Sequence, residues 1–140
     1  MNKLTLIIRI LLGTLFFVFG LNGFLNFIPV PTDMPEKLVT FSSGLMASVY
    51  FFPFLKGTEV ICGLMLLSGV FVPLALVVLA PIIINIFLVH AFLAPSGLAM
   101  AIAIGAMEIY LAFFASPYKE IVKQIFRCPK KEAMDARKKS

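Results

Sequence analysis

Apolar and polar positions are arranged in blocks along this chain, with long hydrophobic stretches separated by short polar breaks. The longest apolar region, residues 56–94, contains only three ionisable side chains, those of Lys56, Glu59 and His90. As a helix it would extend about 58 Å at about 1.5 Å per residue, close to twice the ~30 Å hydrocarbon core of a bilayer. Because the stretch 68–73 contains both a glycine and a proline near the middle, the pattern predicts two membrane-spanning helices joined by a tight turn.

The same reasoning along the whole chain predicts an up-down bundle of four spans. We expect these spans at residues 4–27, 54–72, 73–93 and 98–116. The first span is longer than the apolar part of a signal peptide, and no A-x-A-like cleavage site follows it, so we expect it to remain in the protein. The predicted fold class is an all-α membrane protein, with the four-transmembrane-helix bundle occupying residues 1–117.

Residues 36–52, between the first and second spans, have apolar side chains at helical spacing. A capping threonine, an early proline and an acidic first turn precede them in residues 32–36, which is typical of a helix start. A fifth span here would leave almost no loop before Lys56 and would put the two basic ends of the chain on opposite sides of the membrane. We therefore expect an interfacial helix, lying in the membrane surface or re-entering it.

The composition supports an integral membrane protein. Hydrophobic residues make up 61% of the chain and charged residues 14%, against about a quarter charged in a typical soluble domain, and the mean hydropathy is +1.03. A soluble protein of 140 residues is excluded by these values. The lipid bilayer is thus the first partner that the sequence predicts.

Positive charge is concentrated at the carboxy-terminal end. Eight of the twelve Lys and Arg residues lie in residues 119–139, directly after the last apolar span. The positive-inside rule explains this patch as a cytoplasmic tail, so we expect no nucleic-acid partner and both termini in the cytoplasm. Residues 118–140 then form a basic cytoplasmic segment, amphipathic at first and disordered from residue 130.

The two cysteines, Cys62 and Cys128, lie in different predicted environments, an apolar helix and the basic tail. No CxxC pair or zinc-type spacing occurs. We expect neither a disulfide-dependent fold nor a metal site.

Two charged residues, Arg9 and Glu108, are predicted at similar depths near the cytoplasmic side of the first and fourth spans. Counted from the span ends, they differ in depth by roughly 4 to 5 Å, which an arginine side chain can bridge. We therefore predict an ion pair that fixes the orientation of two neighbouring helices. A ligand-binding or proton-exchanging role for the pair is the alternative, because charges within a membrane are often functional.

A second polar layer is predicted near the opposite side, formed by Asn22, Lys56, Glu59 and His90. Lys56 and Glu59 are three residues apart on one helix face, so they can pair as a simple anchor. If His90 is instead the partner of Glu59, the two form a carboxylate and an imidazole able to exchange protons, a candidate catalytic pair. With Asn22 from the first span, they would line an outer pocket.

Asn85 is predicted to lie in mid-membrane, four residues after Pro81. Pro81 leaves the carbonyl group of Val77 without its usual helical donor, which bends the helix locally. Asn85 can hydrogen-bond across the bundle or donate to the carbonyl group of a ligand, and the sequence leaves both alternatives open.

Two segments carry a resemblance to a known family. Residues 9–22, RILLGTLFFVFGLN, and residues 59–90, EVICGLMLLSGVFVPLALVVLAPIIINIFLVH, resemble the DoxX family. The resemblance covers about residues 5–116 and implies a small bacterial inner-membrane protein of four helices. It also implies that Arg9, Glu59 and His90 are family polar residues.

The resemblance further implies a redox function. Relatives include a subunit of an archaeal thiosulfate:quinone oxidoreductase and proteins linked to thiol redox and oxidative stress. Many relatives carry a basic residue where this chain has Asn22, which argues against an anion such as thiosulfate in the outer pocket.

Our first functional hypothesis is a quinone- or thiol-linked redox component, or the membrane subunit of such an oxidoreductase. A quinone is the candidate cofactor, because it needs an apolar slot with a few hydrogen-bonding groups, such as Glu59, His90 and Asn85. The chain carries no haem, iron–sulfur or flavin motif, so electrons would come from a redox partner protein or a thiol substrate. The alternatives are a non-enzymatic membrane scaffold or assembly factor and, third, a small transporter. A second copy of the chain, in a homo-oligomer, is a further candidate partner.

Overall fold

The computed structural model describes residues 1–140, and its elements are all helical. Along the chain the α-helices are α1 (Lys3–Leu25), α2 (Glu36–Ala47), α3 (Phe51–Ser68), α4 (Val72–Phe92), α5 (Leu98–Ile109), α6 (Tyr118–Ile125) and α7 (Pro129–Lys139). A 3-10 turn, η1 (Pro95–Gly97), precedes α5, and a π-helical turn, η2 (Tyr110–Phe114), continues it.

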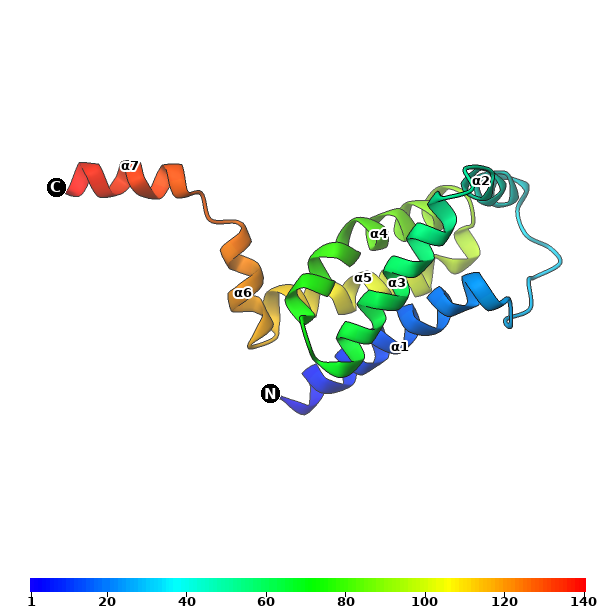
Figure 1. Cartoon of the computed structure of the whole chain (residues 1–140), viewed down its shortest axis with the longest axis horizontal. Coiled ribbons are helices and arrows are strands. Elements are labelled where there is room, and N and C mark those ends of the chain that lie inside the picture. The colour runs from blue at the N-terminus through cyan, green and yellow to red at the C-terminus, as the bar shows by residue number, and fades with distance from the viewer.

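Four helical segments are long and apolar enough to cross a membrane: α1, α3, α4 and the continuous segment Pro95–Phe114. They run alternately up and down and lie side by side in one bundle (Figure 1). The predicted fold class, an all-α membrane protein with a four-helix up-down bundle, is confirmed.

The two ends of this bundle are distinct (Figure 1). Helix α2 lies across one end, which we call the α2 end. The amino terminus and α6 lie at the other end, which we call the α6 end, and α7 projects from there away from the bundle. The chain therefore enters and leaves the bundle at the same end.

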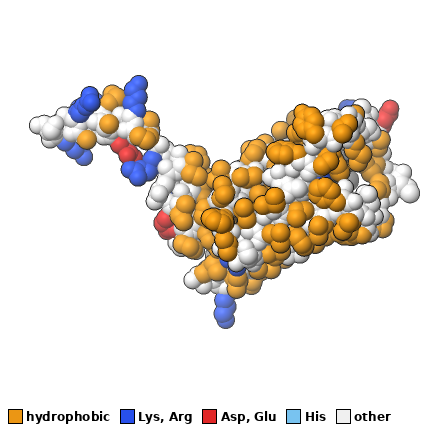
Figure 2. Space-filling view, in the orientation of Figure 1, with side chains coloured by type: hydrophobic (Ala, Val, Ile, Leu, Met, Phe, Trp, Pro, Cys, Tyr) orange, Lys and Arg blue, Asp and Glu red, His pale blue; other side chains and the backbone are white.

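Hydrophobic side chains cover the outside of the bundle, whereas Lys and Arg side chains gather on α7 (Figure 2). Only 23 of 140 residues are buried, and large apolar side chains such as Ile84 and Phe92 are 60% and 72% exposed. In water such a surface would be strongly unfavourable, so the exposed apolar belt is the face that meets lipid. The largest fully buried side chains of the core are leucines from four segments: Leu12, Leu66, Leu76, Leu79 and Leu111.

Helices α1 and α3 form the closest contact, because glycines replace side chains where they meet. A Cβ atom added to Gly13 would lie 2.9 Å from the Cβ of Leu66, and one added to Gly63 would lie 2.6 Å from the backbone nitrogen of Phe17. Small residues that let two backbones approach are the usual way to associate helices in lipid, where apolar surface alone gives little driving force.

The interfacial helix is shorter than the predicted 36–52, and α3 begins before the predicted residue 54. At this boundary Ser48 is the last, capping residue of α2, and its Oγ accepts a hydrogen bond from the backbone N–H of Phe51, the first residue of α3, at 3.0 Å. Val49, with φ of 69°, turns the chain between the two helices. No residue of α2 is buried, and its position across the bundle end suits an interfacial helix.

The tail differs from the sequence prediction. We expected disorder from residue 130, but residues 129–139 form α7, in which every residue is exposed. Pro129 occupies the first turn, an acidic residue lies near the amino-terminal end, and three basic residues occupy the last turn. The proline favours a helix start, and the charged residues interact favourably with the helix dipole. The net charge of the segment does not reveal this arrangement.

Candidate functional site

A pocket of about 220 Å³ lies inside the bundle toward the α2 end. All four spans contribute to its lining: Leu15, Phe16, Phe19, Lys56, Glu59, Ile86, His90 and Met100. We call this the α2-end pocket. It brings together Glu59 and His90, the two residues for which we predicted proton exchange, and adds Lys56 between apolar and aromatic walls.

Glu59 is paired with Lys56. The Nζ atom of Lys56 lies 3.0 Å from Oε2 of Glu59, and the Glu59 residue is only 4% exposed. The Lys56 side chain is 20% exposed, its stem lies against Gly23 of α1, and its ammonium is 5.9 Å from the centroid of the Phe52 ring. The pair is therefore a largely buried ion pair that forms part of a pocket wall, rather than an anchor in water.

His90 is held in place by its own helix end. Its Nδ1 atom lies 3.2 Å from the backbone oxygen of Ala94, and Gly97 of η1 lies against the ring, where any side chain would collide with it. In the tautomer with hydrogen on Nδ1, the ring donates to Ala94 and leaves Nε2 as a free acceptor. Glu59 and His90 share no hydrogen bond, so the structure places them around one pocket without pairing them.

The structure places neither Asn22 nor Asn85 in this pocket. Oδ1 of Asn22 accepts the backbone N–H of Ile28 at 2.8 Å, so the side chain shapes the turn that follows α1. Asn85 is exposed on the outer side of α4, while its neighbours Ile83 and Ile86 face inward. Successive side chains of a helix are rotated by about 100° around its axis. Asn85, which lies between the inward-facing Ile83 and Ile86, therefore points toward lipid.

The predicted ion pair between Arg9 and Glu108 is not formed, since no such contact occurs within 4.0 Å. Instead, Nη1 of Arg9 donates to the hydroxyl of Tyr118 at 3.2 Å, and the guanidinium lies against Gly69 in the turn between α3 and α4. The depth estimate missed this contact because we expected Tyr118 on the surface, in the amphipathic segment. The carboxyl group of Glu108 has no hydrogen-bond partner.

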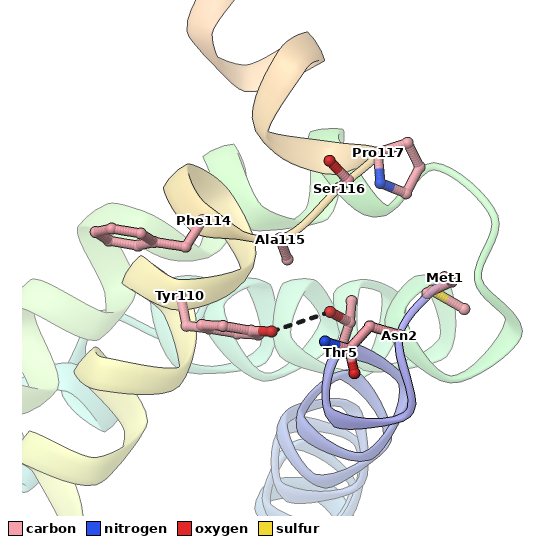
Figure 3. Close-up of a pocket in the computed structure, with 8 residues that line it drawn as sticks. All are labelled: Met1, Asn2, Thr5, Tyr110, Phe114, Ala115, Ser116 and Pro117. Atoms are coloured by element: carbon pink, nitrogen blue, oxygen red, sulfur yellow. Dashed lines mark hydrogen bonds between the residues drawn. The ribbon is translucent and has the colours of Figure 1, made fainter.

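A second cavity, of about 550 Å³, opens at the α6 end (Figure 3). The hydroxyls of Thr5 in α1 and Tyr110 in η2 share a hydrogen bond of 3.1 Å across it. Asn2, also in the lining, accepts the backbone N–H of Leu4 at 2.7 Å and caps α1. The Thr5–Tyr110 hydrogen bond thus joins the first and last spans of the bundle, a role that the sequence reasoning did not assign to either residue.

The fold and the α2-end pocket together define a multi-pass membrane protein in which three polar side chains converge on a pocket between its spans. The family model for DoxX matches residues 4–91, more than half of the chain, and the chain belongs to the DoxX family. The matched region contains Lys56, Glu59 and His90 but ends before Met100 and Glu108. No similar protein was found among curated proteins, and none among solved structures.

Proposed function

We propose that this chain is the membrane component of a quinone-linked redox system and that the α2-end pocket receives the quinone head group. The observation that carries the proposal is the convergence of Lys56, Glu59 and His90 on one small, otherwise apolar pocket. Pockets that are mainly apolar with a few converging polar groups are typical of small-molecule and cofactor sites.

The residues present fit a quinone ring. Phe16, Phe19 and Met100 supply apolar walls, while Lys56 retains N–H donors beyond the one directed at Glu59. The volume of about 220 Å³ is below the ~300–1,000 Å³ of typical ligand pockets, so it suits a single ring with the isoprenoid tail outside.

Within this proposal the side chains have separate tasks. Lys56 would donate a hydrogen bond to a ring carbonyl oxygen, and Nε2 of His90 would take up a proton and pass it to a ring oxygen as the quinone is reduced. Glu59 holds the ammonium of Lys56 in position at 3.0 Å. A bound quinone would supply the two-electron chemistry. The overall reaction with a thiol substrate balances as two thiols plus a quinone giving a disulfide plus a quinol, with two electrons and two protons transferred.

We further propose that the protein lies in the bacterial cytoplasmic membrane with both termini in the cytoplasm. The amino terminus, α6 and α7 share one end of the bundle, and most basic residues of the chain lie in that region. The α2-end pocket then lies toward the outer face of the membrane, within reach of extracytoplasmic redox partners.

The proposal is tested by titrating the purified protein in lipid nanodiscs with short-chain ubiquinone and menaquinone analogues. We expect saturable binding of one analogue by the wild type and at least tenfold weaker binding by His90→Ala. Asn85→Leu is the matched control, since it removes a polar group of the same helix outside the pocket. Absence of binding to both analogues, or equal affinity of wild type and His90→Ala, would overturn the proposal.

A non-enzymatic scaffold is the second candidate, and one observation favours it: Glu59 already has a partner within the chain. Under this alternative, Glu59→Gln and His90→Ala would leave the set of proteins co-purified from native membranes unchanged. Loss of a partner in either variant would contradict it.

A further inference from the structure

A groove of about 530 Å³ lies on the outside of the bundle between α4 and α5. Its rim carries apolar side chains that face lipid, including Ile84 and Ile109, which are 60% and 53% exposed. Phe87 and Phe113 add aromatic surface to its walls. The groove shares no residue with the α2-end pocket, so it is a separate site.

Glu108 is the only ionisable side chain that lines this groove. The residue is 7% exposed, and its Oε2 atom is buried without any hydrogen-bond partner. A smaller cavity of about 150 Å³, toward α6, also reaches Glu108 and is otherwise lined by apolar residues. An unpaired carboxylate in such surroundings is strongly disfavoured, so the group must either hold a proton or face a cation.

No group of this chain supplies that cation. The side chains that α4 and α6 contribute to the two cavities are apolar. The guanidinium of Arg9 in α1 bonds to Tyr118 and lies beyond ion-pair distance of Glu108. Of the other titratable groups packed nearby, Tyr110 of η2 bonds to Thr5, and Cys62 of α3 is a buried thiol that carries no positive charge.

Two features of the backbone lie beside this site. A Cβ atom added to Gly105, one turn before Glu108, would meet no atom within 4 Å, so this glycine leaves space that no neighbouring helix fills. Two residues after Glu108 the helix widens into the π-helical turn η2, and the backbone N–H of Ala115, which caps this turn, donates to the carbonyl oxygen of Tyr110. Such turns occur frequently at functional sites.

We propose that this groove binds a membrane-soluble organic cation, with Glu108 as its counter-charge and Phe87 and Phe113 against its apolar body. The empty site holds one proton on the carboxyl group. When one monovalent cation enters from the lipid, that proton leaves to water, so the charge of the site is unchanged. The aromatic walls favour cations whose charge is delocalised or shielded by rings.

The test uses the full chain in nanodiscs and radiolabelled tetraphenylphosphonium. We expect saturable binding of one cation per chain, with apparent affinity rising up to about tenfold per pH unit, the limit for one proton exchanged. Tetraphenylborate, which has the same shape and the opposite charge, should not bind. Absence of saturable phosphonium binding between pH 6 and 9, affinity independent of pH, or equal binding of the borate would overturn the proposal.

Variants separate the groove from other sites. Glu108→Gln should lose binding by at least tenfold, and Gly105→Leu should lose it as well, because it fills the groove and leaves the carboxyl group in place. Asn85→Leu is the control for a lipid-facing change on α4 and should bind as the wild type does. Wild-type affinity in either groove variant would refute the assignment.

Two further outcomes point to other occupants. If Glu59→Gln abolishes cation binding, the cation sits in the α2-end pocket and the groove proposal fails. If Gly105→Cys chains form disulfide-linked dimers while the wild type binds no cation, the groove is an interface between two copies, which also overturns it. The quinone titration described above is independent of each of these results.

Discussion

The ion pair between Lys56 and Glu59 offers the sharpest test of whether the α2-end pocket is a buried site. Lys56→Met is the chosen change, because methionine keeps an unbranched stem that can lie against Gly23 while removing the charge. The variant leaves the carboxyl group of Glu59, 4% exposed, without its partner.

The expected loss of stability follows from burial. Removing one partner of a fully buried pair costs about 3–5 kcal/mol, whereas exposed pairs contribute about 0.2–1 kcal/mol. Since the Lys56 side chain is 20% exposed, we expect the lower end of the buried range, about 3 kcal/mol, for Lys56→Met. Glu59→Gln should cost less, because the charge that it leaves unpaired, the ammonium of Lys56, belongs to the more exposed side chain of the two.

A double-mutant cycle isolates the interaction itself. Unfolding of the wild type, Lys56→Met, Glu59→Gln and the double variant in micelles with increasing SDS, followed by far-ultraviolet circular dichroism, should give a coupling free energy of about 2 kcal/mol. The absence of tryptophan makes a backbone signal the natural probe. A coupling below about 0.5 kcal/mol would mean that the pair behaves as an exposed one and would refute the buried arrangement.

Three further predictions follow from other contacts. Gly63→Ala should lower the free energy of unfolding by about 1–3 kcal/mol in the same SDS assay, because the added Cβ meets the backbone of α1. Gly105→Ala should leave this free energy unchanged, because its Cβ meets no atom within 4 Å. Equal losses of stability in the two variants would contradict the packing. Tyr118→Phe removes the hydroxyl that accepts from Arg9 and should lower the stability of α6 against local unfolding by about 1.5–3 kcal/mol. Amide exchange in residues 118–125 should then be faster than in the wild type. Unchanged exchange would argue against this contact. The pKa of Glu132 is lowered by hydrogen bonds from the guanidinium of Arg127, so its contribution to α7 is present above the unfolded pKa of about 4.3 and is lost as pH falls through the lower folded value. The protection of amides in residues 129–139, relative to the unfolded chain at the same pH, should therefore fall there. Glu132→Gln should remove this fall, and an unchanged fall in the variant would contradict the assignment.

The spans were predictable because the length and polarity of a lipid-crossing helix are set by the bilayer itself. Four apolar stretches of sufficient length therefore identify four helices without knowledge of their partners. The start of α3 was missed because it follows a local turn, with Val49 at a φ of 69° and a hydrogen bond from Phe51 to Ser48, which composition does not encode. Residue-level capping decides such boundaries more than hydropathy does.

For the candidate site, the sequence predicted only the depth of its residues in the membrane. Counting residues from the span ends placed Glu59 and His90 in one layer, and both line the α2-end pocket. The same counting failed for Arg9 and Glu108, because depth gives no information on how each helix is rotated about its axis. For α4 the rotation could not be read at all, since the helix is apolar on nearly every side and Asn85 gave no amphipathic pattern to fit.

Because the chain is synthesised from its amino terminus, the α2-end pocket is completed late in biogenesis. Its lining comes from all four spans, and the last contribution, Met100, lies in α5. A nascent chain that has inserted α1, α3 and α4 can already bring α1 and α3 together through their glycines, yet its pocket has one wall missing. Any ligand that needs the whole pocket will therefore distinguish the finished protein from its unfinished or truncated forms, and will favour the former during biogenesis.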